Sequence, residues 1–442
     1  MNSRTVHGQK WHGHATAKAV ALTGCAALVL GVTGTATAHA GSRDLGREVL
    51  PAGDGWASEG AGTTGGSAAD AEHVYTVTTW AEFKQALADG GGAPKIIKVV
   101  GTIDAVSEGC DAFAADGYDF QQYLADYDPA VWGHDTPVSG EQEELRAASA
   151  AEQDKAIKAN IPANTTIVGV GRDAAILGGS LQIKGVDNVI VRNLTIEAPV
   201  DCFPQWDPTD DNKTGAWNSE YDGVVVYGST HVWIDHNTLT DGRHPDSSLP
   251  AYFGKVYQQH DGLVDVVRGG DLVTVSWNSF KDHDKTMLIG NSDGAGATDT
   301  GKLRVTLHHN RFEGIVERAP RVRFGQVDSY NNHFVVTKDQ KFGYVFGIGA
   351  GSRLHATHNA FTLAKGVSTG KVLKKWNEAP LTAENNYVNG RLTDLIAVHN
   401  AEVPAETLQS GAGWTPALRT RVDHPRAVPG IVDHRAGAGR LR

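Results

Sequence analysis

A short pattern that ends in asparagine returns seven times between about residues 188 and 388. In each copy, apolar and polar residues alternate along a strand-like segment before the Asn. The copies end at Asn193, Asn237, Asn278, Asn310, Asn331-Asn332, Asn359 and Asn385-Asn386. A unit of this kind cannot bury its apolar side alone, so the repeat predicts stacked coils of parallel β-structure. We expect the Asn side chains to form a ladder at a left-handed corner, where Asn is tolerated.

Two segments outside the repeat have their own patterns. Residues 139–159 are rich in Glu, Ala and Lys and end before Ile161-Pro162, which predicts a helix within an insert at 108–159. Residues 402–442 lose the Asn pattern and gain Pro, Gly and Arg, so we expect this tail to wrap the coils.

The first 40 residues carry three cations and no acid, followed by an apolar run at 19–32 and a small-residue stretch ending Ala38-His39-Ala40. This order is typical of a signal peptide at 1–40 and leaves 41–442 as one secreted domain. A membrane anchor is the weaker alternative, because a span needs about 20 apolar residues. A lipoprotein box at 22–25 is also weaker, because most of the apolar run follows Cys25.

Two cysteines remain after the predicted cleavage, Cys110 and Cys202. An oxidising compartment favours a disulfide between them, and two buried free thiols are the alternative.

The chain is acidic, with 51 Asp and Glu against 40 Lys and Arg and a net charge of -11. Its pI of about 5.9 argues against general binding of nucleic acid or an anionic membrane. Residues 301–325 are an exception: six Lys or Arg stand against two Glu there, a local charge of +4. An anionic ligand would be drawn to this segment.

Acids and bases concentrate between residues 220 and 323 in a way that the repeat does not require. The acids are Glu220, Asp222, Asp261 and Asp265, and the bases are Lys285, Arg318, Arg321 and Arg323. Each acid alone is better explained as a solvated surface group, but together they are oxygen ligands suited to Ca²⁺ or Mg²⁺. Asp261 and Asp265 would lie about 13 Å apart on a straight strand. One ion could contact both only if the chain bends, for which Gly262 is the candidate.

Histidines near the repeat have a simpler interpretation than catalysis. His236, His308 and His309 stand beside the repeated Asn, so we expect them to stack or hydrogen-bond within the coils. Trp233 and Trp277 occupy strand positions and are expected to pack rather than to bind sugar.

Several motifs in order resemble the extracellular pectate lyases of polysaccharide lyase family 1. They are Trp233-Ile234-Asp235-His236-Asn237, Asp261-Gly262-Leu263-Val264-Asp265, Val273-Thr274-Val275-Ser276-Trp277-Asn278, Lys285, His308-His309-Asn310 and Arg318-Ala319-Pro320-Arg321-Val322-Arg323. The resemblance covers roughly residues 56–388. It implies an all-β fold, a right-handed single-stranded parallel β-helix, which agrees with the repeat.

The resemblance also implies roles for individual residues. Asp222, Asp261 and Asp265 match calcium-binding acids, and Glu220 matches an additional acid of some members. Lys285 and Arg323 match residues that bind substrate carboxylates, and Arg318 matches the proposed catalytic base.

The implied reaction is β-elimination on α-1,4-linked polygalacturonate, with Ca²⁺ as cofactor and a 4,5-unsaturated product. A guanidinium normally keeps its proton, so Arg318 can act as base only if its pKa falls. We expect Lys285, Arg321, Arg323 and the ion to lower that pKa by like-charge repulsion, which predicts activity that rises into alkaline pH.

Three other functions compete with this interpretation. A pectin lyase would act on methyl-esterified polymer without calcium and would lack the acid cluster. A polygalacturonase-like hydrolase would need paired carboxylates to activate water. A non-catalytic β-helix could bind acidic polysaccharide without turnover, because fold does not fix function. We expect a monomer that binds neither nucleic acid nor, once the signal peptide is removed, a membrane.

Overall fold

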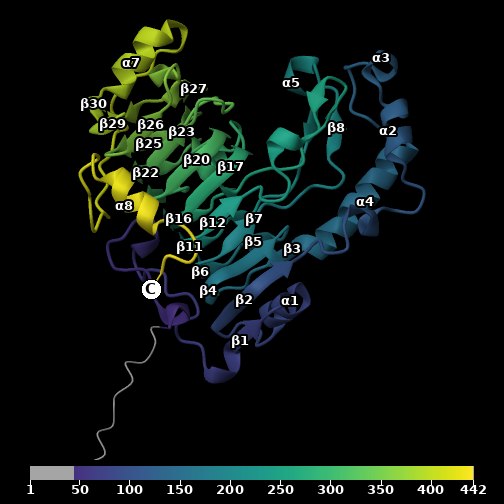
Figure 1. Ribbon diagram of the computed structural model, residues 1–442, viewed down its shortest axis with the longest axis horizontal. Helices are drawn as coiled ribbons and strands as arrows, with labels where there is room; N and C mark the ends of the chain where they lie inside the picture. The colour runs from purple at the N-terminus through teal and green to yellow at the C-terminus, as the bar shows by residue number, and fades with distance from the viewer. Residues whose placement is uncertain (1–43, 442) are drawn as a thin grey trace, which may run out of the picture. The chain divides into compact units, whose positions relative to one another are not determined.

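Three parallel strands build each coil of the repeat. The coil that contains Asn237 runs through β10 (Val224–Tyr227), β11 (Thr230–Asp235) and β12 (Thr238–Thr240), and the next coil repeats the order directly above it. The computed structural model describes residues 44–441, and the predicted signal peptide lies outside them (Figure 1). The predicted parallel β-helix is confirmed, because each strand pairs in parallel with its counterpart one coil away.

The first strand of every coil belongs to one eight-stranded sheet. Its members are β3 (Lys158–Asn160), β5 (Ser180–Lys184), β10, β15 (Val264–Val267), β18 (Leu288–Ile289), β21 (Arg321–Val322), β24 (Phe346–Ile348) and β27 (Leu373–Lys375).

The second and third strands of the coils form two ladders that join into one larger sheet. They join because β4 pairs with both β6 and β7 across the corner of the first coils. The members are β1 (Val74–Val77), β2 (Lys95–Asp104), β4 (Thr165–Leu177), β6 (Asp187–Arg192), β7 (Thr195–Glu197), β11, β12, β16 (Asp271–Ser276), β17 (Ser279–Lys285), β19 (Val305–His308), β20 (Arg311–Glu317), β22 (Gln326–Tyr330), β23 (His333–Val336), β25 (Arg353–Thr357), β26 (Ala360–Leu363), β28 (Leu381–Thr382), β29 (Asn386–Val388) and β30 (Arg391–Thr393).

Inward side chains of all three ladders stack in rows and form the main core. Phe280, Phe312, Phe334 and Phe361 make one such row, with successive ring centroids 4.7, 4.8 and 5.0 Å apart. Like side chains recur at the same place in each coil, so burying one row excludes water from the whole column.

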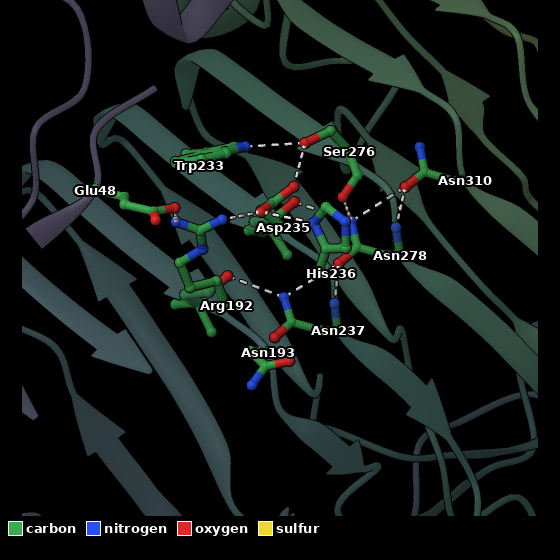
Figure 2. Close-up of polar contacts among 12 residues, drawn as sticks. Glu48, Arg192, Asn193, Trp233, Asp235, His236, Asn237, Ser276, Asn278 and Asn310 are labelled. Carbon is green, nitrogen blue, oxygen red and sulfur yellow. Dashed lines mark hydrogen bonds and ion pairs between the residues drawn. The ribbon is translucent and has the colours of Figure 1, made fainter. Parts of the chain in front are cut away.

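The Asn ladder lies at the turn between the second and third strands. The side-chain Oδ1 of each ladder Asn accepts a hydrogen bond from the backbone N–H one coil earlier, as between Asn278 and Asn237 at 2.8 Å (Figure 2). The same contact continues through Asn310, Asn332, Asn359 and Asn386. Each amide therefore satisfies a turn N–H that burial would otherwise leave unpaired.

The structure corrects one detail of this ladder. The left-handed residue is the one before the ladder Asn: His236, Trp277 and His309 have φ of 52°, 54° and 55°. Asn193 holds that left-handed position in its own coil, with φ 58°, and Leu194 takes the ladder position, where its N–H donates to Asn237 Oδ1 at 3.1 Å. The first copy of the repeat was therefore assigned one residue too early.

Histidine and tryptophan side chains at the left-handed position stack on one another, as expected. The ring centroids of His236 and Trp277 lie 5.8 Å apart, and those of Trp277 and His309 lie 4.2 Å apart. Trp233 is buried against Leu50 and Ile190. These rings serve packing at a corner of the β-helix.

Helices cover the ends and one side of the coils. They are α1 (Trp80–Ala88), α2 (Phe120–Asp126), α3 (Pro129–Trp132), α4 (Glu141–Ile157), α5 (Asp210–Lys213), α6 (Gly296–Asp299), α7 (Leu395–Glu402) and α8 (Val428–Arg435) (Figure 1). Phe83 of α1 and Leu395 of α7 join the main core, so these helices close its two ends. The predicted helix at 139–159 is confirmed as α4. No helix in residues 44–441 has the length and apolar character needed to cross a membrane.

The insert is attached to the coils by a disulfide and a second apolar cluster. Cys110 and Cys202 are bonded across a separation of 92 residues, which confirms the predicted pairing. Tyr123 and Tyr127 of the insert pack with Trp206, Trp217 and Tyr257 from loops of the coils. The long loops before β10 and β15 are therefore held by the insert.

The C-terminal tail runs back along the ladder corner. Arg419 pairs with Asp328, and the Asp423 carboxylate accepts a hydrogen bond from His309 Nε2 at 3.1 Å. Further on, the N–H groups of Gly437 and Gly439 donate to Trp277 O and Asn193 Oδ1 at 2.7 and 2.8 Å. One continuous segment thus contacts coils near both ends of the repeat.

Candidate active site

Three of the predicted acids meet at the start of β10 and β15 on the outer side of the eight-stranded sheet. Asp222 precedes β10 by two residues, Asp261 precedes β15, and Asp265 lies within β15. Asp222 Oδ1 accepts a hydrogen bond from Gly262 N at 2.8 Å, and Asp265 Oδ1 accepts one from Leu288 N at 2.9 Å. Two of the carboxylates are therefore fixed by backbone donors of neighbouring coils.

Gly262 makes room for this cluster. A Cβ atom at residue 262 would lie 2.3 Å from Asp265 Oδ1 and 2.9 Å from Asp222 Oδ1, closer than atoms can approach. The sequence suggested Gly262 as the bend between Asp261 and Asp265. The structure gives a different reason for glycine, because two carboxylates pack against its Cα.

The electrostatics confirm that the three acids are neighbours. Burial, followed by repulsion from Asp265 and Asp261, raises the pKa of Asp222 well above its usual range. Burial, followed by repulsion from Asp261, raises the pKa of Asp265 to about 7. A concentration of negative charge of this kind is relieved by a bound cation.

Glu220 stands apart from the other acids. Its side chain is 65% exposed and lies 3.3 Å from Lys158 Nζ, at the C-terminal end of α4. The structure therefore does not bring Glu220 into contact with the other three acids.

The predicted bases lie further along the coils, at the end of β17 and in and after β21. Lys285 ends β17, and its Nζ lies 3.3 Å from Asp261 Oδ1. Arg321 of β21 is paired with Leu288 of β18, and Leu288 is level with Asp265 of β15. Arg321 is therefore in line with Asp265 but two coils away. Arg323 is buried, donates to Gly290 O at 2.9 Å and pairs with Asp293. Lys285 thus lies beside the acids at β15, and Arg321 lies two coils further along.

Arg318 adopts a left-handed backbone conformation, with φ 61°, directly before the Ala319-Pro320 peptide bond. Its Nε donates to Glu317 Oε1 at 3.0 Å. Burial alone would lower the pKa of Arg318, but the charges of Glu317, Tyr344, Asp261 and Asp265 outweigh it, and the pKa is raised. The sequence predicted that cations of the chain and a bound ion together lower this pKa; in the chain by itself the adjacent Glu317 shifts it upward, so the predicted lowering depends on the ion. By contrast, burial and the charge of Arg323 lower the pKa of Arg321.

Two other groups in residues 44–441 place three possible metal-ligating atoms within 4.8 Å of one another. Asp70, Glu72 and His73 are mostly exposed side chains of one 3₁₀ turn. Asp241, Asp246 and His260 are more buried, but both ring nitrogens of His260 contact carbonyl oxygens, at 2.9 and 2.8 Å. Both ring nitrogens of His260 are thus already engaged with the backbone. Asp222, Asp261 and Asp265 do not place three ligand atoms within 4.8 Å of one another. The carboxylate of Asp261 lies instead 3.3 Å from Lys285 Nζ.

Sequence reasoning missed three contacts of this site. Glu317 and Asp293 pair with Arg318 and Arg323, and the Arg321 guanidinium carbon lies 4.1 Å from the centroid of the Trp376 ring. Gly347 lies between Arg321 and β27 in the same register row, and a Cβ there would meet the Arg321 side chain. The adjacency of Glu317 and Arg318 was visible in the sequence, but the Trp376 contact depends on coil stacking.

A parallel β-helix that brings acids and a lysine together on its outer side is the architecture of a class of polysaccharide lyases, and comparison with known proteins places the chain in that class. The chain belongs to the pectate lyase family, whose model matches residues 35–123 and 124–407. A pectate lyase of Bacillus subtilis (strain 168) is 43% identical over 425 residues, which cover 94% of this chain and 98% of that protein.

Solved structures agree with this assignment. The structure of the thermostable pectate lyase PL 47 is 43% identical, with a TM-score of 0.87 over 90% of this chain and 100% of that one. A pectate lyase bound to a hexasaccharide is 41% identical, with a TM-score of 0.85 and the same coverage.

Proposed function

We propose that this chain is a secreted, calcium-dependent pectate lyase that cleaves α-1,4-linked polygalacturonate by β-elimination. The observation that carries the proposal is the cluster of Asp222, Asp261 and Asp265, next to Lys285 and Arg318, in which burial and mutual repulsion raise the pKa of Asp222 and Asp265. The hexasaccharide complex of a similar pectate lyase supports an oligosaccharide as the ligand of this sheet.

Calcium fits the donor set of the acid cluster. The three side chains offer only carboxylate oxygens, which hard cations prefer. Backbone N–H groups occupy one oxygen of Asp222 and one of Asp265, and the other oxygens remain for a ligand. A bound Ca²⁺ would polarise a substrate carboxylate and so make the proton on the adjacent carbon more acidic. Glu220 has a side chain exposed to solvent, so we assign it at most an outer contact.

Lys285 and Arg323 are proposed to bind the carboxylates of the polymer. Lys285 contacts Asp261 across the site, so it lies where a sugar carboxylate would approach the acids. Arg323 is held by Gly290 O, which orients its guanidinium without neutralising it, and its Asp293 partner is half-exposed and displaceable. Two fixed cations would orient a galacturonate residue with its C5 proton toward the base.

Arg318 is proposed to remove that C5 proton. The bond between C4 and the glycosidic oxygen then breaks, and its electrons leave with the oxygen while a double bond forms between C4 and C5. Asp261 and Asp265 both help to keep the proton on Arg318 in the chain by itself. Once a cation compensates these two charges, the balance shifts toward the neutral guanidine that a base requires.

The decisive test is the ultraviolet absorbance of the unsaturated product on polygalacturonate, with and without EDTA. We expect turnover with calcium and its loss on chelation. If reducing sugar forms without the absorbance, the protein is a hydrolase. Activity on methyl-esterified pectin that survives EDTA would indicate a pectin lyase. Binding of the polymer without either product would indicate a non-catalytic β-helix. Size-exclusion chromatography of the secreted protein would test the expected monomer.

A further inference from the structure

The three acids of the site are not held in the same way. Asp222 and Asp265 each accept a backbone N–H, whereas in the described chain the carboxylate of Asp261 contacts only Lys285. The Asp261 side chain is also 34% exposed. Its position must therefore be set mainly by its backbone.

That backbone is held by a buried histidine of β17. His283 Nε2 lies 2.7 Å from the carbonyl oxygen of Asp261, and His283 Nδ1 lies 2.5 Å from Asp241 Oδ1. Both side chains of the His283–Asp241 pair have no exposed surface. Since a carbonyl oxygen can only accept, the ring donates from Nε2, and the short contact with the carboxylate fixes the ring plane.

The residue before Asp261 is anchored too. The ring nitrogens of His260 lie 2.9 Å from Pro199 O and 2.8 Å from His244 O. His260 and His283 approach with ring centroids 6.1 Å apart. The backbone at Asp261 is therefore held at two points, by His283 of β17 at its carbonyl oxygen and by the preceding residue His260, which is anchored to carbonyl oxygens of other loops.

Strand β17 contacts Asp261 twice. His283 and Lys285 are two residues apart, so they point to the same side of the strand, one toward the Asp261 carbonyl and the other toward its carboxylate. Neither Asp241 nor His283 belongs to the residues that we propose to touch calcium or substrate.

We propose that His283, oriented by Asp241, is a positioning residue that sets the calcium affinity of the site through Asp261. Hydrogen-bond partners behind metal ligands commonly change metal affinity by about 10- to 100-fold when they are removed. The inference rests on the proposed calcium site and adds a residue that the acid cluster by itself does not indicate.

The test compares His283→Gln with the matched control His333→Gln. His333 is also buried, lies on β23 of the same ladder two coils away, and contacts Asp433 at 2.8 Å and Thr362 Oγ1 at 2.9 Å. Calcium binding to each full-length protein is measured by calorimetry, and the melting temperature is measured in EDTA. We expect His283→Gln to raise the calcium Kd by about 10- to 100-fold, with kcat near that of the wild type at saturating calcium. His333→Gln should lower the melting temperature and leave the calcium Kd unchanged.

Other outcomes would overturn the proposal. An unchanged Kd in His283→Gln, or an equal increase in both variants, would mean that His283 only stabilises the fold. If wild-type protein bound no calcium, the proposed function would fail with it. If His283→Gln does not fold, Asp241→Asn decides the matter by the same criterion, because it keeps the shape of the pair and removes its charge.

Discussion

Two buried aspartates of this β-helix have opposite electrostatics. Asp235, at the end of β11, lies 2.8 Å from an Arg192 nitrogen, the Ser276 hydroxyl and His236 Nδ1 (Figure 2). Burial would raise its pKa, but the charges of His236 and Arg192 outweigh burial, and the pKa of Asp235 is lowered. For Asp265, burial and the charge of Asp261 raise the pKa to about 7.

The difference separates a structural carboxylate from one suited to bind a ligand. Asp235 has all its partners within the chain and joins three coils at the ladder corner. Of the acids at β10 and β15, only Asp261 pairs with a cation of the described chain, Lys285, and repulsion among the acids adds to the effect of burial on Asp222 and Asp265. Buried carboxylates without an internal partner are costly, which supports the proposed calcium site.

The largest expected effect is on turnover, and it distinguishes Arg318 of the acid cluster from Arg192, the partner of Asp235. Arg318→Ala should lower kcat on polygalacturonate by about 10³-fold, the range of general-base catalysis, and leave substrate binding nearly intact. The measurement is the initial rate of absorbance increase, with binding followed by calorimetry. Arg192→Ala should reduce stability instead of turnover, and a fall in kcat of similar size would contradict the comparison.

Replacing Asp235 by Asn should change the free energy of unfolding, whereas replacing Asp265 by Asn should change calcium binding. Asp235→Asn leaves Arg192 buried with a weaker partner, so we expect a loss of about 3 kcal/mol in the free energy of unfolding. Asp265→Asn removes repulsion, so it should leave stability in EDTA unchanged or increased while calcium binding is lost. Denaturant unfolding in EDTA and calcium titration would check both, and equal destabilisation by the two variants would contradict the assignment.

Stability without calcium should depend on pH through the acid cluster. A carboxyl group with a raised pKa in the folded protein prefers its proton there, so stability falls as pH rises from about 4 toward about 7. For Asp265, with a pKa of about 7, we expect a loss of about 3 kcal/mol between pH 5 and pH 8 in EDTA. Calcium at pH 8 should restore it, and the dependence should be weaker in Asp265→Asn, where burial still raises the pKa of Asp222.

The smallest expected effect comes from Gly262→Ala. The added methyl group would displace the carboxylates of Asp265 and Asp222, which we expect to weaken calcium binding by about tenfold, or 1.4 kcal/mol. Gly347→Ala is the control, because its Cβ would meet Arg321 and Tyr344 instead of the acids. Unchanged calcium affinity in Gly262→Ala would mean that the cluster tolerates the shift.

Much of the fold was predictable because the repeat is periodic. The recurrence of Asn278, Asn310, Asn332 and Asn359 after similar strands marked one coil each, and the parallel stacking of those strands followed from it. The exception was Asn193, because the αL residue and the ladder residue are adjacent and can both be Asn.

The site was predictable as a set of residues but not as a set of contacts. The motif that contains Asp261 and Asp265 and the segment from Arg318 to Arg323 indicated the chemistry. The raised pKa of Arg318 depends on Glu317 and on acids two coils away, and the pair of His283 and Asp241 joins residues 42 positions apart. Such distances in sequence are set by loop lengths, which composition and periodicity do not determine.

The C-terminal tail has a consequence for how the molecule loses its structure. In a simple solenoid each coil contacts only its neighbours, so coils at either end can unravel separately. Here the segment that reaches Asp328, Trp277 and Asn193 links distant coils directly. Fraying at the end of the chain therefore removes contacts from the first coils as well, which favours a single all-or-none unfolding transition over stepwise peeling.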